Sequence, residues 1–107
     1  MKTRAKYYRA KILGMGVRTS GNFVLYGTKI VFEPYSSALI SSAVEIPIAN
    51  ITQLSEKRFP DLLFRKGIVI EEKNGLEVKK HEVVFWNVGT EEIIAKINNL
   101  AKKPKKQ

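Results

Sequence analysis

Apolar residues recur with a period of two along much of the chain, the pattern typical of β-strands. Val44, Ile46 and Ile48 alternate with polar or small residues, which places three branched side chains on one face of an extended segment. Runs rich in branched and aromatic residues lead to the same prediction elsewhere. Strands are expected at 7–13, 23–26, 29–33, 44–49, 51–54, 67–72 and 76–86.

Glycine, asparagine and proline mark where these strands end. Glycine, serine and asparagine crowd the segment 14–22, for which we therefore expect a loop. Gly27 allows a tight turn between two antiparallel strands, and the pair Asn74 and Gly75 is the strongest hairpin signal in the chain. Pro47 has no N–H to donate, which predicts an edge strand or a bulge around it.

The last expected strand changes phase along its length. Leu76 and Val78 share one face, whereas Val83 and Phe85 share the other. A bulge within residues 79–81 would bring both pairs to the same face. We therefore expect an irregular strand there.

The period changes to that of a helix near the C-terminus. Thr90 is the expected N-cap, and the carboxylates of Glu91 and Glu92 suit the positive end of a helix dipole. The residues that then recur at spacings of three and four are Ile93, Ile94, Ile97, Leu100 and Ala101. This stripe predicts an amphipathic helix over residues 91–103, ended by Pro104.

Charge is concentrated at the two ends of the chain. The formal net charge of the 107 residues is +9, but residues 1–18 hold six Lys/Arg and no acid, and residues 96–107 hold five Lys and no acid. We therefore expect basic end segments around a nearly neutral folded body. The chain has no cysteine and no long apolar run, which favours a soluble cytoplasmic protein, with a peripheral position at a membrane as the alternative.

Few residues have the pattern of a catalytic or metal site. The Gly14–Gly16 segment is too short for a phosphate-binding loop, and a single histidine leaves no histidine-based metal cluster. His81 is expected at a surface or bulge position, and Glu71 and Glu72 on opposite faces of a strand. We therefore expect a protein that is not an enzyme and has no cofactor, metal or small-molecule substrate.

Several short segments occur in a characteristic order. They are Gly21, Phe23 and Leu25, then Thr28 to Phe32, then Glu45 to Ile48 with Ile51, then Gly67, Ile68 and Ile70 with the turn at Asn74 and Gly75, and finally the helix. In this order they resemble the GRAM and bacterial PH-like domains over residues 5–102. The resemblance implies a mainly β fold, a split barrel of seven antiparallel strands in two packed sheets, capped by one C-terminal helix. One such domain would span 1–103, followed by a basic tail at 104–107.

The resemblance leaves the function open, because PH-like folds bind lipids, peptides and proteins. We expect a non-enzymatic protein-interaction or self-associating domain. The apolar side chains of one connection form the candidate interface, namely Phe59, Leu62, Leu63 and Phe64. Such a connection packs on its own domain or contacts a partner, including a second copy of the chain.

Binding of an anionic membrane surface is the alternative. In a PH-like barrel, three loops at the end away from the helix would gather basic and apolar side chains. These candidate lipid-binding residues are Lys11, Arg18, Lys29, Lys73, Tyr35, Leu39 and Ile40. Nonspecific attraction of nucleic acid by the basic ends is the least favoured possibility.

Overall fold

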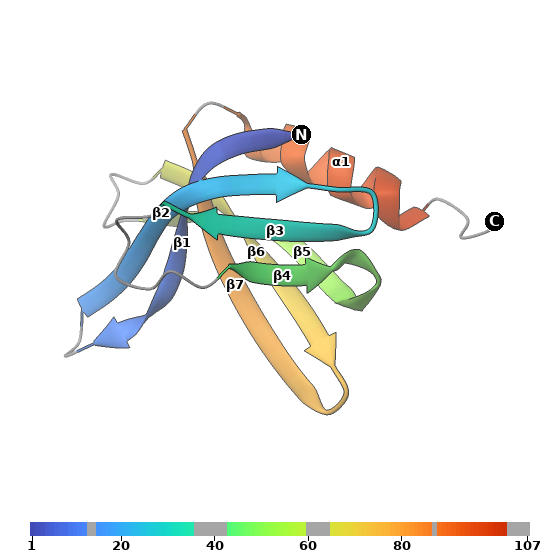
Figure 1. Cartoon of the computed structure of the whole chain (residues 1–107), viewed down its shortest axis with the longest axis horizontal. Coiled ribbons are helices and arrows are strands. Elements are labelled where there is room, and N and C mark those ends of the chain that lie inside the picture. Colours follow the sequence, from blue (N-terminus) through green and yellow to red (C-terminus); the bar gives the residue numbers. More distant parts are fainter. Residues whose placement is uncertain (13–14, 36–42, 60–64, 87, 103–107) are drawn as a thin grey trace.

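The computed structural model of the chain describes residues 1–12, 15–35, 43–59, 65–86 and 88–102, with the backbone alone at 8–12, 15–18 and 102. Within these residues, a mainly β fold is followed by a single helix (Figure 1). The elements are β1 (Lys2–Ile12), β2 (Met15–Leu25), β3 (Lys29–Pro34), β4 (Val44–Pro47), the 3-10 helix η1 (Ile48–Asn50), β5 (Ile51–Phe59), β6 (Arg65–Asn74), β7 (Glu77–Phe85) and α1 (Thr90–Lys102).

The seven described strands form one antiparallel sheet in the order β4-β3-β2-β1-β7-β6-β5. Seven antiparallel strands and a C-terminal helix are as expected, but the strands form one sheet, which is not closed, with β4 and β5 as its edges. The junction of its two halves is short, because β1 pairs with β7 only through Ala5, Lys6 and Tyr7. On either side of this junction, β2 to β4 run across the view of Figure 1, whereas β6 and β7 run diagonally.

The core lies on the concave face of this sheet. Ala5 is small, and beside it Phe23 of β2 meets Phe85 of β7 edge to face, with ring centroids 4.9 Å apart. Tyr7 stacks on Phe32 of β3 at 5.3 Å. The aliphatic side chains that complete this buried cluster include Leu25, Ile30, Ile46, Ile48, Ile68, Ile70, Val83, Ile93 and Ile97. Burial of this apolar surface holds the two halves of the sheet together.

Helix α1 packs against β5, β6 and η1. Its buried side chains are Ile93 and Ile97, and Ile94 and Leu100 pack partly buried against the core, which confirms the predicted stripe except at Ala101, which is exposed. The cap differs from the expectation: the Gly89 carbonyl accepts the first helical hydrogen bond, from Ile93 N–H at 3.3 Å, while the Thr90 hydroxyl donates to Glu56. No helix in the described part of the chain has the length and apolar character needed to cross a bilayer.

The expected loop over residues 14–22 is wrong for most of its length, because β2 begins at Met15. Gly21, one of the residues that suggested this loop, has another role in the sheet. A Cβ at Gly21 would lie 2.3 Å from the Glu33 carbonyl oxygen, so the close approach of β2 and β3 requires glycine there. The N-terminal strand is also longer than expected and begins at Lys2.

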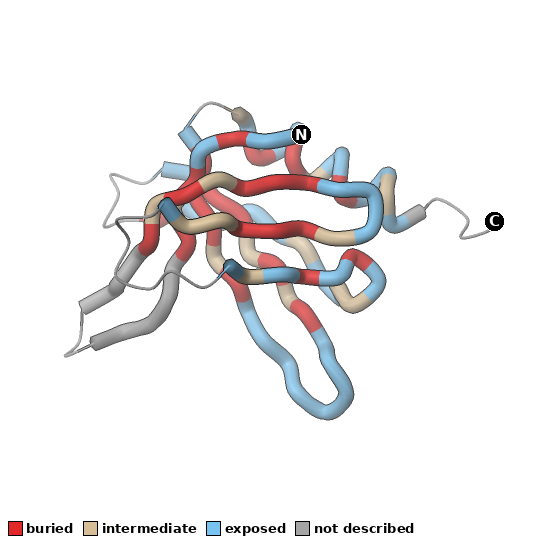
Figure 2. Tube along the Cα trace, in the orientation of Figure 1, coloured by how far each residue is buried: buried red, intermediate tan, exposed pale blue. Residues whose placement is uncertain are grey.

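The hairpin between β6 and β7 confirms the turn at Asn74 and Gly75, where Gly75 has a φ of 64°. The expected bulge at 79–81 is wrong, since the register of the two strands is continuous from Gly67 to Asn74. The phase change has a different cause. The hairpin projects beyond the rest of the molecule (Figure 2), so Leu76 and Val78 are 101% and 56% exposed.

The core position of α1 leads to a test of stability. Replacing Ile97 with aspartate places an unpaired charge in the core and should lower the free energy of unfolding by about 3 to 5 kcal/mol. Asn98→Asp adds the same charge at the neighbouring exposed position and should change it by less than about 0.5 kcal/mol. Urea unfolding of both variants measures the difference, and similar losses would show that the helix is packed through another face.

Candidate functional site

Trp86 lies at the end of β7, on the face of the sheet opposite the core. Lys6 alternates with the inward-facing Ala5 and Tyr7, so its side chain lies on this outer face. The Lys6 Nζ atom is 5.6 Å from the Trp86 ring centroid, and the Arg65 Cζ atom is 4.9 Å from it. Trp86 remains 40% exposed between these cations. Cation–π contacts of this kind hold the indole ring at the surface.

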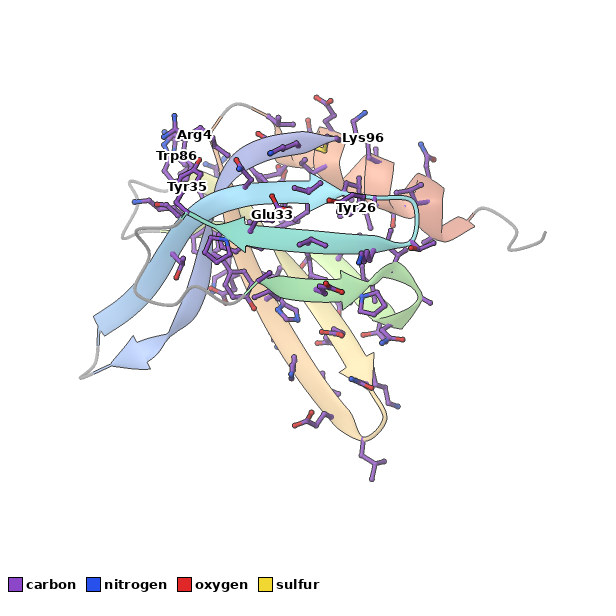
Figure 3. The ribbon with its side chains drawn as sticks, in the orientation of Figure 1. Arg4, Tyr26, Glu33, Tyr35, Trp86 and Lys96 are labelled. Atoms are coloured by element: carbon purple, nitrogen blue, oxygen red, sulfur yellow. The ribbon has the colours of Figure 1, made fainter. Side chains whose placement is uncertain are left out.

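Two pockets adjoin the indole ring. The first, of about 240 Å³, is lined by Trp86 and Tyr35 together with Arg4 and Lys6. The second, of about 390 Å³, is lined by Trp86 and Arg65 and by the start of α1. Figure 3 shows Arg4, Tyr35 and Trp86 gathered at one end of the sheet, away from Tyr26 and Lys96. We name this surface the Trp86 face and define it by Arg4, Lys6, Tyr35, Arg65 and Trp86.

The cations of the Trp86 face have no carboxylate partner among the described residues. The ion pairs of that part of the chain are Lys29–Glu45, Lys57–Glu82, Lys66–Glu56, His81–Glu72 and Lys96–Glu92. None of them includes Arg4, Lys6 or Arg65. The surface around Trp86 therefore keeps its positive charge and would attract an anionic group.

This site was missed in the sequence because the N-terminal bases were assigned to a basic end segment separate from a nearly neutral folded body. Lys2, Arg4 and Lys6 belong to β1, which lies inside the sheet with β2 on one side and β7 on the other. The expected division into basic ends and a neutral body is therefore wrong for the N-terminal segment. Alternation of these bases with Thr3, Ala5 and Tyr7 is a strand pattern, and it is the signal that could have revealed them.

The described residues of the expected lipid site do not lie together. Lys29 begins β3 and Tyr35 directly follows its other end. The Lys29 Nζ atom is 3.4 Å from Glu45 Oε1. Lys73 lies on the projecting β6–β7 hairpin, which points away from the β1–β2 end in Figure 1. The backbones of Lys11 and Arg18 belong to β1 and β2, while their side chains and the whole of Leu39 and Ile40 lie outside the described residues.

Phe59, one of the expected interface residues, is buried. Its side chain is 2% exposed, so it offers no apolar surface to a partner. A Cβ at Gly67 would lie 2.6 Å from the Phe59 ring and 2.4 Å from the Val83 carbonyl oxygen, which shows how closely the ring covers this glycine. The other three expected interface residues, Leu62, Leu63 and Phe64, lie outside the described residues.

A chain of polar side chains crosses the core. His81 Nδ1 lies 2.5 Å from the Tyr7 hydroxyl, and its Nε2 lies 2.9 Å from Glu72 Oε1. A carboxylate only accepts hydrogen bonds, so Nε2 carries a hydrogen, and in the neutral ring Nδ1 accepts from Tyr7. The expectation of a surface or bulge position for His81 is wrong: it pairs in regular register with Ile70 of β6, and it is 5% exposed.

This buried chain connects β1, β7 and β6, and none of its three residues lines a pocket beside Trp86. Its arrangement supports a structural role, because each hydrogen bond satisfies a polar group removed from water. Glu71, by contrast, lies on the other face of β6, as the alternation of side chains along a strand predicts. Its Oε1 atom accepts a hydrogen bond from the Thr52 hydroxyl at 3.3 Å. No three His, Asp or Glu side chains in the described ranges are placed to hold a metal ion.

Comparison with known proteins gives no functional assignment, so the function has to be inferred from the site. No family model matches the chain, and no curated protein matches it in sequence.

The polar chain in the core can be tested by removing one hydroxyl group. Tyr7→Phe keeps the ring but leaves His81 Nδ1 without this donor, so the free energy of unfolding should fall by about 1 to 3 kcal/mol. Tyr35→Phe removes the same group at an exposed position and should change it by less than about 0.5 kcal/mol. Chemical denaturation measures both, and equal effects would contradict the structural role of the chain.

The contact of Phe59 with Gly67 leads to a second test. Gly67→Ala should lower the free energy of unfolding by about 1 to 3 kcal/mol, because the added methyl group meets both a ring and a backbone oxygen. Gly27→Ala is the matched control, since a Cβ there meets nothing within 4 Å and should change stability by less than about 0.5 kcal/mol. Thermal unfolding of the pair measures the difference, and a Gly67→Ala protein as stable as the control would be inconsistent with this packing.

Proposed function

We propose that the chain is a non-enzymatic binding module with a PH-like fold, and that it docks a partner protein through the Trp86 face. The PH-like assignment is supported by the strand order, in which seven antiparallel strands follow one another and a C-terminal helix packs beside them. Binding rather than catalysis is supported by the residues that line the two pockets. In the described part of the chain they are basic, aromatic and small side chains, with one carboxylate, from Glu91.

The observation that carries the proposal is a half-exposed tryptophan among cations that have no carboxylate partner in the described residues. Tryptophan, tyrosine and arginine dominate the binding energy of protein interfaces, because they combine large contact area with directed polar groups. The Trp86 face brings all three residue types together around two pockets. Burial of the remaining exposed part of Trp86 by a partner would stabilise the complex.

The same geometry disfavours nucleic acid as the partner. Single-stranded binding sites stack bases on open aromatic rings. Cations from β1 and from β6 are both within cation–π distance of the Trp86 ring. A base that stacks on this ring would compete with them for it.

Binding of an anionic membrane is the second candidate, and a different feature favours it. The β6–β7 hairpin presents the fully exposed Leu76 and the exposed Val78 at its end, together with Lys73, Lys79 and Lys80. Apolar side chains flanked by lysines suit the boundary between lipid headgroups and acyl chains. Membrane binding through this hairpin would leave the Trp86 face free.

Site-specific photo-crosslinking tests the docking of a protein partner. A photoreactive phenylalanine analogue at Tyr35 should form discrete protein adducts in the native cell, because Tyr35 lines a pocket beside Trp86. The same analogue at Tyr26, exposed at the other end of the sheet, is the control and should form none of them. Trp86→Ala should abolish the Tyr35 adducts, which mass spectrometry identifies.

Each contrary outcome is informative. An adduct of two copies of this chain would make self-association the docking event. Equal adducts from both positions, or none from Tyr35, would refute the Trp86 face as the docking surface. Cosedimentation with phosphatidylserine vesicles that is lost in Leu76→Ser and kept in Trp86→Ala would favour the membrane candidate instead.

A further inference from the structure

Trp86 stands between two basic pockets and separates them. Strand β7 lies between β1 and β6 in the sheet, and Lys6 comes from β1 whereas Arg65 comes from β6. The pocket on the β1 side contains Arg4 and Lys6, and the one on the β6 side contains Arg65. A ligand that fills both pockets therefore has to cross over the indole ring.

The two pockets differ in charge. Among the described residues, no carboxylate lines the β1-side pocket, so none of these residues neutralises Arg4 and Lys6 there. On the β6 side, Glu91 lines the same pocket as Arg65 and Lys66, and Lys66 is also 3.9 Å from Glu56. The strongest attraction for an anion is thus on the β1 side, with a weaker one across the ring.

From this arrangement we propose that the partner segment is an acidic, extended stretch of polypeptide that crosses Trp86 and places carboxylates against Arg4 and Lys6 on one side and against Arg65 on the other. The inference rests on the proposed function and names the chemistry of the partner. Carboxylates form bidentate hydrogen bonds with guanidinium groups, and tryptophan between them contacts the apolar parts of the crossing chain.

The spacing of the cations favours several charges rather than one. Lys6 Nζ and Arg65 Cζ lie 5.6 Å and 4.9 Å from the centre of the same ring, and they come from strands on its two sides. Alternate side chains of an extended peptide are about 7 Å apart and point the same way. Acidic residues at alternate positions can therefore meet one cation each.

The test uses Trp86 as its own reporter, because it is the only tryptophan in the chain. A peptide of alternating glutamate and serine, titrated into the full chain, should change the tryptophan fluorescence with saturation. The same peptide with glutamine in place of glutamate is the control for charge and should bind at least about tenfold more weakly. A peptide of equal composition with its glutamates in one block tests the alternate spacing, and we expect weaker binding by about threefold or more.

Variants of the chain locate the contact. Arg4→Gln combined with Lys6→Gln should weaken binding of the alternating peptide by about tenfold or more, and Arg65→Gln by about threefold. Lys73→Gln combined with Lys96→Gln removes the same total charge away from the Trp86 face and should weaken binding by less than about twofold. Circular dichroism spectra establish that each variant is folded.

Three results would overturn the inference. They are equal affinity for the glutamate and glutamine peptides, equal losses in the two double variants, and tighter Arg4- and Lys6-dependent binding of an oligothymidylate of the same charge. Photo-crosslinking from Tyr35 in the Arg4→Gln, Lys6→Gln protein separates this failure from that of the proposed function. Undiminished protein adducts would support the docking surface but contradict an acidic partner segment. Loss of the adducts would support both the docking surface and the acidic partner.

Discussion

The short pairing of β1 with β7 determines which residues meet on both faces of this sheet. Only three residue pairs join the halves, through Ala5, Lys6 and Tyr7. Because side chains alternate along a strand, two of these residues face the core and the third faces outward. The same three positions therefore organise the core and the candidate binding surface.

On the inner face, size and polarity at this junction decide how the halves pack. Ala5 is the small residue beside which Phe23 and Phe85 come into contact across β1. Tyr7 packs on Phe32 and also bonds to His81, so it joins the apolar cluster to the buried polar chain. A polar group without a partner in the core would be costly, and the paired arrangement of Tyr7, His81 and Glu72 avoids that cost.

On the outer face, the junction brings Lys6 to Trp86 from one side while β6 brings Arg65 from the other. The cations from β1 and β6 repel one another, and the electron-rich face of the indole offsets part of that repulsion. The outcome is a positively charged surface to which Arg4 and Lys6 of β1 and Arg65 of β6 contribute, at the ends of the strands.

The sequence by itself determined the features that depend on near neighbours. The hairpin at Asn74 and Gly75, the apolar stripe of α1 and the edge position of Pro47 all follow from backbone geometry over a few residues. Strand number was also predictable, because alternation is a local property. The strand boundaries were less predictable, since Gly21, one of the residues that suggested a loop at 14–22, serves the close approach of β2 to β3.

Tertiary structure alone decided the residues that depend on distant partners. Tyr7 and His81 are 74 positions apart, and no local pattern shows that their side chains will form a hydrogen bond. The cations beside Trp86 come from β1 and β6, and Trp86 directly follows β7; the register of these three strands follows from burying the apolar face of the whole sheet. Periodicity shows which face of its own strand a side chain occupies, but contacts across strands depend on how the complete core packs. For this reason the candidate binding surface around Trp86 emerged only from the fold.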